Sequence, residues 1–231
     1  RCEIEARDMD LNFDGVIYGN GCYVEYNNEV IFHQPLTLEQ CTHFVNWCNE
    51  RDLAFRLECN DGMFLSEGYE EKSRLTRYKY TYGLEANYSD KPLPPLSRHM
   101  ISGKNLFRDA VNKTAFVLKS YQDFLDVKEE FSNMAVDTWG GKGELALYGA
   151  TRAKGFDKEN SIHLLLKYLN VDPKDAIAFG DGVVDIPMFK ACGFSVAMDN
   201  GNDEVKQAAS YVTDDVDQDG LYNAFKYLKL I

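Results

Sequence analysis

A short apolar segment followed by two carboxylates constrains this chain more than any other feature. The segment Ala176–Phe179 has the length of a buried strand, and Gly180-Asp181 follows it, with Asp185 four residues after the first aspartate. The residues after Asp185 include Pro187 and predict a helix with the proline in its first turn and Asp185 as its N-cap. Both carboxylates therefore follow a strand at its carboxyl end, where open α/β sheets bind ligands. Such oxygen ligands suit Mg²⁺, although a turn Asp and a capping Asp would leave the same pattern.

Charge and hydropathy exclude several classes of function. The formal net charge of −12 and the pI near 4.8 disfavour nucleic acid and anionic membrane surfaces as partners, because both are bound by basic patches. No apolar run approaches the roughly 20 residues that span a bilayer. We therefore expect a cytoplasmic protein with no nucleic-acid or membrane partner. A phosphate site in so acidic a chain would need local cations such as Mg²⁺ and lysine.

The cysteines and histidines show no metal-ligand pattern. The six cysteines include no Cys-x-x-Cys pair, and free cytosolic thiols are expected. Cys41 and Cys48 lie seven residues apart on one predicted helix and are expected to share its buried face. No two of the four histidines are spaced four residues apart, so a zinc site is not expected.

Local signals predict the elements of the first half of the chain. Asn27-Asn28 predicts a hairpin turn between strands over 23–26 and 29–32, and Thr37 with Gln40 predicts a capping box that opens a helix. Residues 1–12 are expected to end a helix that leads into a strand ending at Tyr18. The other expected elements are strands over 53–59, 63–66, 114–119, 134–139 and 144–148, and helices over 68–82 and 121–131.

The order of the predicted strands and helices changes near Arg152. From there to the end, strand-like and helix-like segments alternate, which predicts a parallel sheet with helices on its faces. The block over about 34–150 has hairpin features that break this alternation. We interpret it as an α/β insertion.

The ordered segments of the second half resemble a known family. Lys158 opens a helix, Gly180-Asp181 and Asp185 follow the next strand, and Asn200-Gly201 follows the strand after it. This order resembles the haloacid dehalogenase superfamily, specifically its Cof-type phosphatases, over nearly the whole chain. The resemblance implies a Rossmann-like, doubly wound parallel-sheet core over 1–33 and 151–231. It also implies an inserted α/β cap of type C2 over 34–150.

The resemblance assigns a role to each candidate site residue. Asp181 would bind Mg²⁺, and Asp185 would hold metal-bound water or Lys158. Lys158 would lie between an aspartate nucleophile and the phosphoryl group, where it reduces the repulsion between two anions. Asn20 and Asn200 would contact the substrate. Three of these residues also have structural alternatives, namely helix capping for Asp185, a surface lysine for Lys158 and a tight turn for Asn20.

Two departures from the family pattern limit the prediction. The Asp-x-Asp-Gly-Thr motif that carries the nucleophile does not occur, and Asp8-Met9-Asp10 is not followed by Gly-Thr. We expect that the segment with this motif and the phosphate-binding strand after it is missing from the sequence. Val184 stands where these phosphatases usually have Asn, which would hydrogen-bond the lysine or a metal-bound water.

The family resemblance implies a Mg²⁺-dependent phosphatase that hydrolyses a small phosphorylated metabolite through an aspartyl phosphate. The chain by itself is expected to be inactive. One alternative is a non-catalytic binding or regulatory protein on the same fold, which Val184 favours. Another is a phosphomutase, which uses the same core and would interconvert sugar phosphates without net phosphate release.

Overall fold

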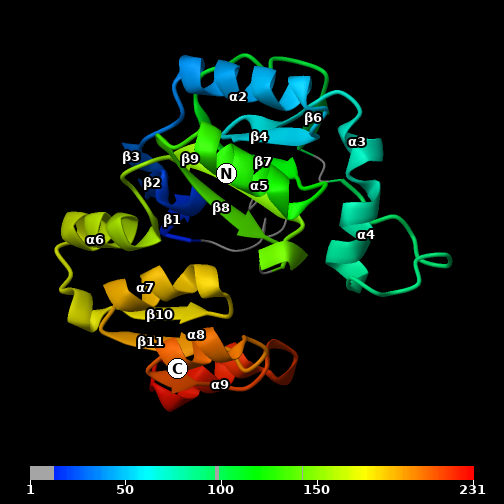
Figure 1. Ribbon diagram of the computed structural model, residues 1–231. Helices are drawn as coiled ribbons and strands as arrows, with labels where there is room; N and C mark the ends of the chain where they lie inside the picture. The colour runs from blue at the N-terminus through cyan, green and yellow to red at the C-terminus, as the bar shows by residue number, and fades with distance from the viewer. Residues whose placement is uncertain (1–12, 97–98, 142) are drawn as a thin grey trace. The chain divides into compact units, whose positions relative to one another are not determined.

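The computed structural model describes residues 13–96, 99–141 and 143–231 (Figure 1). These residues form two compact units. The described part of unit 1 comprises 13–23 and 32–155, and unit 2 comprises 24–31 and 156–231. The helix end predicted over residues 1–12 lies outside the described residues.

A three-stranded sheet begins the described chain. Its order is β1 (Gly15–Tyr18), β2 (Tyr23–Tyr26) and β3 (Glu29–His33), with a short 3₁₀ turn, η1 (Gly19–Gly21), after β1. Asn27 and Asn28 both have positive φ, at 49° and 65°, as a two-residue hairpin turn requires. The predicted hairpin and the strand before it are confirmed.

Unit 1 is built on a six-stranded sheet. Its strand order is β6-β5-β4-β7-β9-β8, and the neighbouring strands are antiparallel except for the parallel pair β5 and β6. In chain order the strands are β4 (Phe55–Cys59), β5 (Gly62–Leu65), β6 (Met100–Ser102), β7 (Val111–Val117), β8 (Met134–Trp139) and β9 (Tyr148–Ala153). The short strand β6 was not predicted from the sequence.

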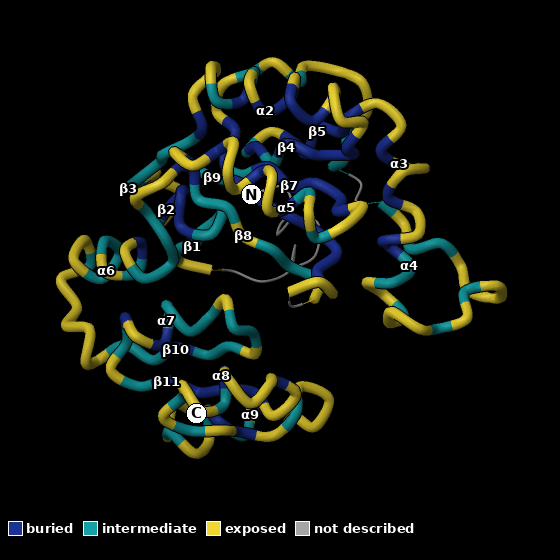
Figure 2. Tube along the Cα trace, viewed as in Figure 1, coloured by how far each residue is buried: buried dark blue, intermediate teal, exposed yellow. Residues whose placement is uncertain are grey.

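Two helices pack their apolar residues against one face of this sheet. Helix α2 (Leu38–Glu50) begins at Thr37 with the predicted capping box, and α5 (Tyr121–Glu130) follows β7. Their buried side chains share one cluster with the strands, in which the largest fully buried side chains are Phe44, Phe55, Phe116 and Phe131. Figure 2 shows this buried interior between α2 and β4. Cys41 and Cys48 are both fully buried there, as predicted.

Two predictions for the helices and strands of unit 1 need correction. The expected helix over 68–82 is two helices, α3 (Tyr69–Lys72) and α4 (Arg74–Tyr82), which meet at Ser73. The expected strand over 144–148 is wrong, because this stretch holds a 3₁₀ turn, η2 (Gly143–Leu145), and the strand β9 begins only at Tyr148.

Gly149 explains why the sequence did not predict the correct bounds of β9. Gly149 pairs with Phe116 on β7, and a Cβ at Gly149 would lie 2.1 Å from the Phe116 ring. The strand therefore needs a small residue at this position to accommodate the neighbouring ring. Strand propensity does not favour glycine, so the signal for β9 lies in its partner strand and not in its own sequence.

The second face of the six-stranded sheet carries charged and aromatic side chains. Glu58 on β4 lies between Arg56 of the same strand and Lys113, its register partner on β7. Its carboxylate accepts a hydrogen bond from Arg56 Nε at 3.0 Å and forms an ion pair with Lys113 Nζ at 3.0 Å. Further along this face, the rings of Trp139 and Tyr148 stack with their centroids 3.9 Å apart.

Unit 2 contains a parallel sheet with helices on both faces. Its order is β10-β11-β12, and its elements are α6 (Lys158–Leu169), β10 (Ile177–Gly180), α7 (Ile186–Ala191), β11 (Phe194–Ala197), α8 (Asp203–Ala208), β12 (Tyr211–Val212) and α9 (Gly220–Tyr227). Ala178 packs with residues of α7 and α8. The adjacent Phe179 packs against Phe225 of α9, with the two ring centroids 5.1 Å apart. Because successive strand residues point to opposite faces, the helices cover both faces. This confirms the predicted doubly wound α/β fold class.

The β2–β3 hairpin tip belongs to unit 2 through its contacts with α6. The Tyr168 hydroxyl bonds Glu29 Oε2 at 3.1 Å, and the rings of Tyr26 and Tyr168 meet edge to face. The hairpin turn thus connects to the helix that Lys158 opens.

Neither membrane-spanning helices nor disulfides occur in the described part of the chain. No helix there combines the length and the apolar character that crossing a bilayer requires. The five described cysteines are free thiols, namely Cys22, Cys41, Cys48, Cys59 and Cys192. Burial raises the pKa of the Cys22 thiol to about 11 and that of Cys59 to about 12, so neither forms a reactive thiolate near neutral pH.

Candidate active site

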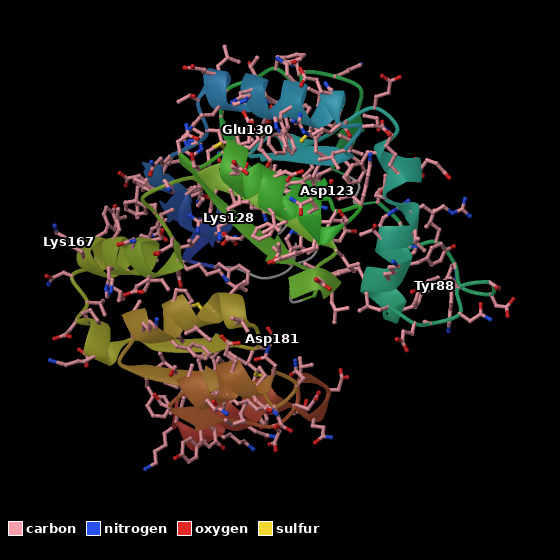
Figure 3. All side chains as sticks on the ribbon, in the orientation of Figure 1. Tyr88, Asp123, Lys128, Glu130, Lys167 and Asp181 are labelled. Carbon is pink, nitrogen blue, oxygen red and sulfur yellow. The ribbon has the colours of Figure 1, made fainter. Side chains whose placement is uncertain are left out.

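The loop after β10 places the two predicted carboxylates in one short turn. Asp181 directly follows the strand and is exposed, and it is labelled in Figure 3. A 3₁₀ turn, η4 (Val183–Asp185), then leads into α7, whose first turn contains Pro187 as predicted. Both aspartates therefore lie at the carboxyl end of a parallel strand, as the sequence indicates.

The Asp185 side chain points back toward the strand and does not cap α7. Its Oδ2 accepts hydrogen bonds from the backbone N–H groups of Asp181 at 3.3 Å and Gly182 at 3.2 Å. Asp185 occupies the predicted N-cap position of α7, but its side chain makes no hydrogen bond to the first turn of that helix. The carboxylate instead holds the loop that carries Asp181.

Lys158 forms an ion pair with the other oxygen of this carboxylate. Its Nζ lies 2.7 Å from Asp185 Oδ1, and the two side chains are 28% and 14% exposed. Lys158 is the first residue of α6, whose N-cap Asp157 accepts a hydrogen bond from the Asn160 N–H. The Asp157 N-cap therefore fixes where α6 begins, and this determines the position of Lys158.

Lys154, four residues before Lys158, binds a different partner. Lys154 Nζ donates to the backbone carbonyl of Ser132 at 2.7 Å, and both residues belong to unit 1. Of the two lysines in the Lys-Gly-x-x-Lys segment, Lys158 is therefore the one that contacts the motif of Asp181 and Asp185.

Asn200 joins the same group from the next strand. It follows β11, and its Nδ2 donates to Asp181 Oδ2 at 3.1 Å. Its Oδ1 accepts a hydrogen bond from the Val216 N–H at 3.2 Å. The sequence places Asn200 near the site but does not reveal either partner, because both contacts join loops that are distant along the chain.

Val184 contributes no polar group at this edge. The residue is 56% exposed, and it lies directly before Asp185. The ion pair between Lys158 and Asp185 forms without a polar side chain at position 184. The orientation of Lys158 therefore rests on Asp185.

The charged side chains of Asp181, Asp185 and Lys158 fit a metal ion that needs few protein ligands. Two carboxylates and one ammonium give the group a formal charge of −1, and no described residue donates a hydrogen bond to Asp181 Oδ1. No cluster of three or more His, Cys, Asp or Glu side chains suited to a metal occurs among residues 13–96, 99–141 and 143–231. A single free carboxylate oxygen is compatible with Mg²⁺, which keeps several waters and binds through one or two carboxylates.

Asn20 lies in a different environment from the other four predicted residues. It occupies the left-handed region at φ 57° and ψ 32° within η1, between two glycines that also have positive φ. It belongs to unit 1, whereas Lys158, Asp181, Asp185 and Asn200 belong to unit 2. The tight turn expected at this position is present, and the substrate contact stays a prediction.

A neighbouring ion pair was not predicted from the sequence. Lys206 Nζ lies 2.7 Å from Asp199 Oδ1, directly before Asn200. Its members come from α8 and from the loop after β11. The signal for it is weak, because lysines and aspartates are common on exposed helices and loops.

Comparison with known proteins identifies relatives along most of the chain. The protein YkrA of Bacillus subtilis is 26% identical over 224 residues, which cover 96% of this chain and 78% of the relative. The phosphoglycolate phosphatase of Methanosarcina acetivorans is 36% identical over 73 residues, which cover 32% of each chain. A solved structure of BT1666 from Bacteroides thetaiotaomicron, described among phosphatases of the haloalkanoate (HAD) enzyme superfamily, aligns with a TM-score of 0.74 and 26% identity. That alignment covers all of this chain and 79% of BT1666.

A family model matches as well. The model of haloacid dehalogenase-like hydrolases matches residues 3–225. This match spans both units and all five predicted site residues. The chain therefore belongs to the haloacid dehalogenase-like hydrolase family.

Proposed function

We propose that this chain supplies the metal-binding carboxylate and the lysine of a Mg²⁺-dependent phosphatase that hydrolyses a small phosphorylated metabolite, such as a sugar phosphate. The observation that carries the proposal is the direct hydrogen-bonded connection from Lys158 through Asp185 to the loop of Asp181. Family membership supports hydrolysis, and two similar proteins are described as phosphatases.

Each residue of the group has a distinct task in this proposal. Lys158 presents an ammonium with three donors, one of which is used by Asp185, so the others can bind phosphoryl oxygens. Asp185 orients the ammonium and holds the loop, since both of its oxygens are engaged by donors. Asp181 is left as the carboxylate that can hold the metal. Bound Mg²⁺ would neutralise phosphoryl oxygens and orient them for attack.

The same proposal assigns the two parts of the chain. Residues 1–33 and 151–231 would contribute to the catalytic core, and 34–150 would form the cap. The parallel sheet over 177–212 and the helix-backed, largely antiparallel sheet over 55–153 support this division for most of the chain. The boundaries differ, because 13–23, 32–33 and 151–155 group with unit 1. Asn20 would contact substrate. The family reaction passes through an aspartyl phosphate, and none of the residues assigned above is its nucleophile.

Metal binding is the first prediction to test. Replacing Asp181 with Asn should reduce the affinity for Mg²⁺ by about 100-fold or more, since ligand loss should exceed the 10–100-fold cost of losing a supporting contact. The measurement is titration of the chain with Mn²⁺, followed by electron paramagnetic resonance, with Mg²⁺ as competitor.

Asp175→Asn is the matched control for this titration. Asp175 is exposed and precedes β10, so it lies at the opposite end of the strand from Asp181. Its replacement should leave the affinity within twofold of the wild type. Equal affinities of the wild type and Asp181→Asn for Mg²⁺ would contradict the proposed metal ligand.

Catalysis gives a separate prediction. The 231-residue chain should release no phosphate above background from p-nitrophenyl phosphate or sugar phosphates, because it has no Asp-x-Asp-Gly-Thr motif. Colorimetric phosphate detection in the presence of Mg²⁺ measures this. Release that disappears in Asp181→Asn would show that another residue of the chain is the nucleophile. Isomerised sugar phosphate without release would favour the mutase.

A further inference from the structure

Asn200 connects the loops that follow three neighbouring strands. Asp181 follows β10, Asn200 follows β11, and Val216 lies in the loop after β12. These strands are adjacent and parallel, so their carboxyl ends lie at one edge of the sheet. The Asn200 amide crosses this edge, with Asp181 on one side and the Val216 backbone on the other.

The partners of this amide determine which way it faces. The Val216 N–H can only donate, so the Asn200 oxygen must face Val216. The Asn200 NH₂ group then faces Asp181 Oδ2, which as a carboxylate oxygen can only accept. A reversed amide would oppose two donors on one side and two acceptors on the other. The Asn200 amide is therefore oriented for a hydrogen-bond acceptor, which the Asp181 carboxylate supplies, and not for a cation.

Backbone contacts hold the Asn200 loop independently of its side chain. The Met198 N–H donates to Gly180 O at 3.0 Å, and the Gly201 N–H donates to Met198 O at 2.9 Å. A Cβ at Gly201 would lie 2.9 Å from the Asp181 carbonyl oxygen, so the glycine permits the close approach of the two loops. Loss of the Asn200 amide should therefore leave the loop in place and remove mainly the contact with Asp181.

We propose that Asn200 is a positioning residue for the Asp181 carboxylate and does not act as a substrate contact. It holds Oδ2 and would leave Oδ1 available to bind a metal ion. This inference rests on the proposed function only in taking Asp181 as the metal ligand. It replaces the substrate-binding role that the family resemblance implies for Asn200.

Metal affinity tests the proposal with a closely matched control. Asn200→Ala should weaken Mn²⁺ and Mg²⁺ binding by about 10–100-fold, the usual effect of removing a group that orients a ligand. Asn202→Ala should change the affinity by less than twofold. Asn202 lies two residues away and caps α8 through the Val205 N–H at 3.1 Å, so its loss perturbs the same loop without touching Asp181.

The outcomes separate this inference from the proposed function. If Asp181→Asn abolishes metal binding and Asn200→Ala leaves it within twofold of the wild type, Asn200 does not position the ligand. If the wild type binds no Mg²⁺, the proposed function fails, and a metal-free measurement then decides the role of Asn200.

That measurement is the side-chain amide resonance of Asn200 in ¹H–¹⁵N correlation spectra of the metal-free protein. Asp181→Ala should shift this resonance and speed its exchange with solvent, because its acceptor is gone. Asp175→Ala should leave it unchanged. An Asn200 amide that does not respond to Asp181→Ala would overturn the proposal, whatever the metal titrations show.

Discussion

Replacing Glu58 with alanine is expected to lower the free energy of unfolding of unit 1 by about 3–5 kcal/mol, the usual cost of removing one partner from a buried ion pair. The Glu58, Arg56 and Lys113 side chains are only 12%, 10% and 16% exposed. Without the carboxylate, two cations would remain close together and poorly hydrated. Both tryptophans, Trp47 and Trp139, belong to unit 1, so denaturation at pH 7 followed by tryptophan fluorescence reports on this unit.

The control for this replacement is Glu129→Ala. Glu129 is exposed on α5, so its loss should change the unfolding free energy by less than about 0.5 kcal/mol. Equal effects of the two replacements would show that the charged group on the sheet contributes no net stability.

The same carboxylate should make stability depend on pH. Burial by itself would raise the pKa of Glu58, but the attraction of Lys113 and Arg56 and their hydrogen bonds outweigh it and hold the pKa at about 2, below the ordinary 4.5. Because the pKa is lower in the folded state, this stabilisation is complete above about pH 4.5 and is lost as the pH falls toward 2. The stability difference between wild type and Glu58→Gln should therefore shrink over that range, as denaturation at several pH values can measure. A difference that stays constant would contradict the depressed pKa.

Replacing Gly180 with alanine is expected to disrupt the candidate active site. A Cβ at Gly180 would lie 2.6 Å from Asp185 Cβ and 2.8 Å from Asp185 Oδ2, closer than real contacts allow. Asp185 would have to move, and its ion pair with Lys158 and its bonds to the loop would be lost or lengthened. We expect a loss of about 1–3 kcal/mol in stability, as for other overpacked sites, and a loss of about tenfold or more in Mn²⁺ affinity.

Gly182→Ala is the control for the crowding at Gly180. The two glycines flank Asp181, yet a Cβ at Gly182 would meet its nearest neighbour, Val184 Cγ2, at an ordinary 3.4 Å. Its φ of −114° is also accessible to alanine. Circular dichroism on melting and the Mn²⁺ titration should therefore separate the two variants. If both behave like the wild type, the close packing of Asp185 against Gly180 is not needed at the site.

Local patterns were sufficient to predict much of the fold. The Thr37 capping box, the Asn27-Asn28 turn and the start of α6 at Lys158 depend on residues within a few positions of one another. Such signals act through short-range sterics and hydrogen bonds. The strand β9 could not be predicted in this way, because Gly149 is set by the Phe116 ring of another strand.

The candidate site likewise has features that follow from local sequence and features that depend on tertiary contacts. The sequence by itself determined that Asp181 and Asp185 follow a strand and that Lys158 opens a helix, because each depends on its immediate neighbours. The family resemblance named Lys158 as one possible partner of Asp185, but only the tertiary structure showed the contact, with a residue 27 positions earlier. The tertiary structure also showed that Asn200 faces Asp181 from the loop after the next strand. Side-chain partners across adjacent strands follow from how the sheet and its helices pack, and no local pattern records that packing.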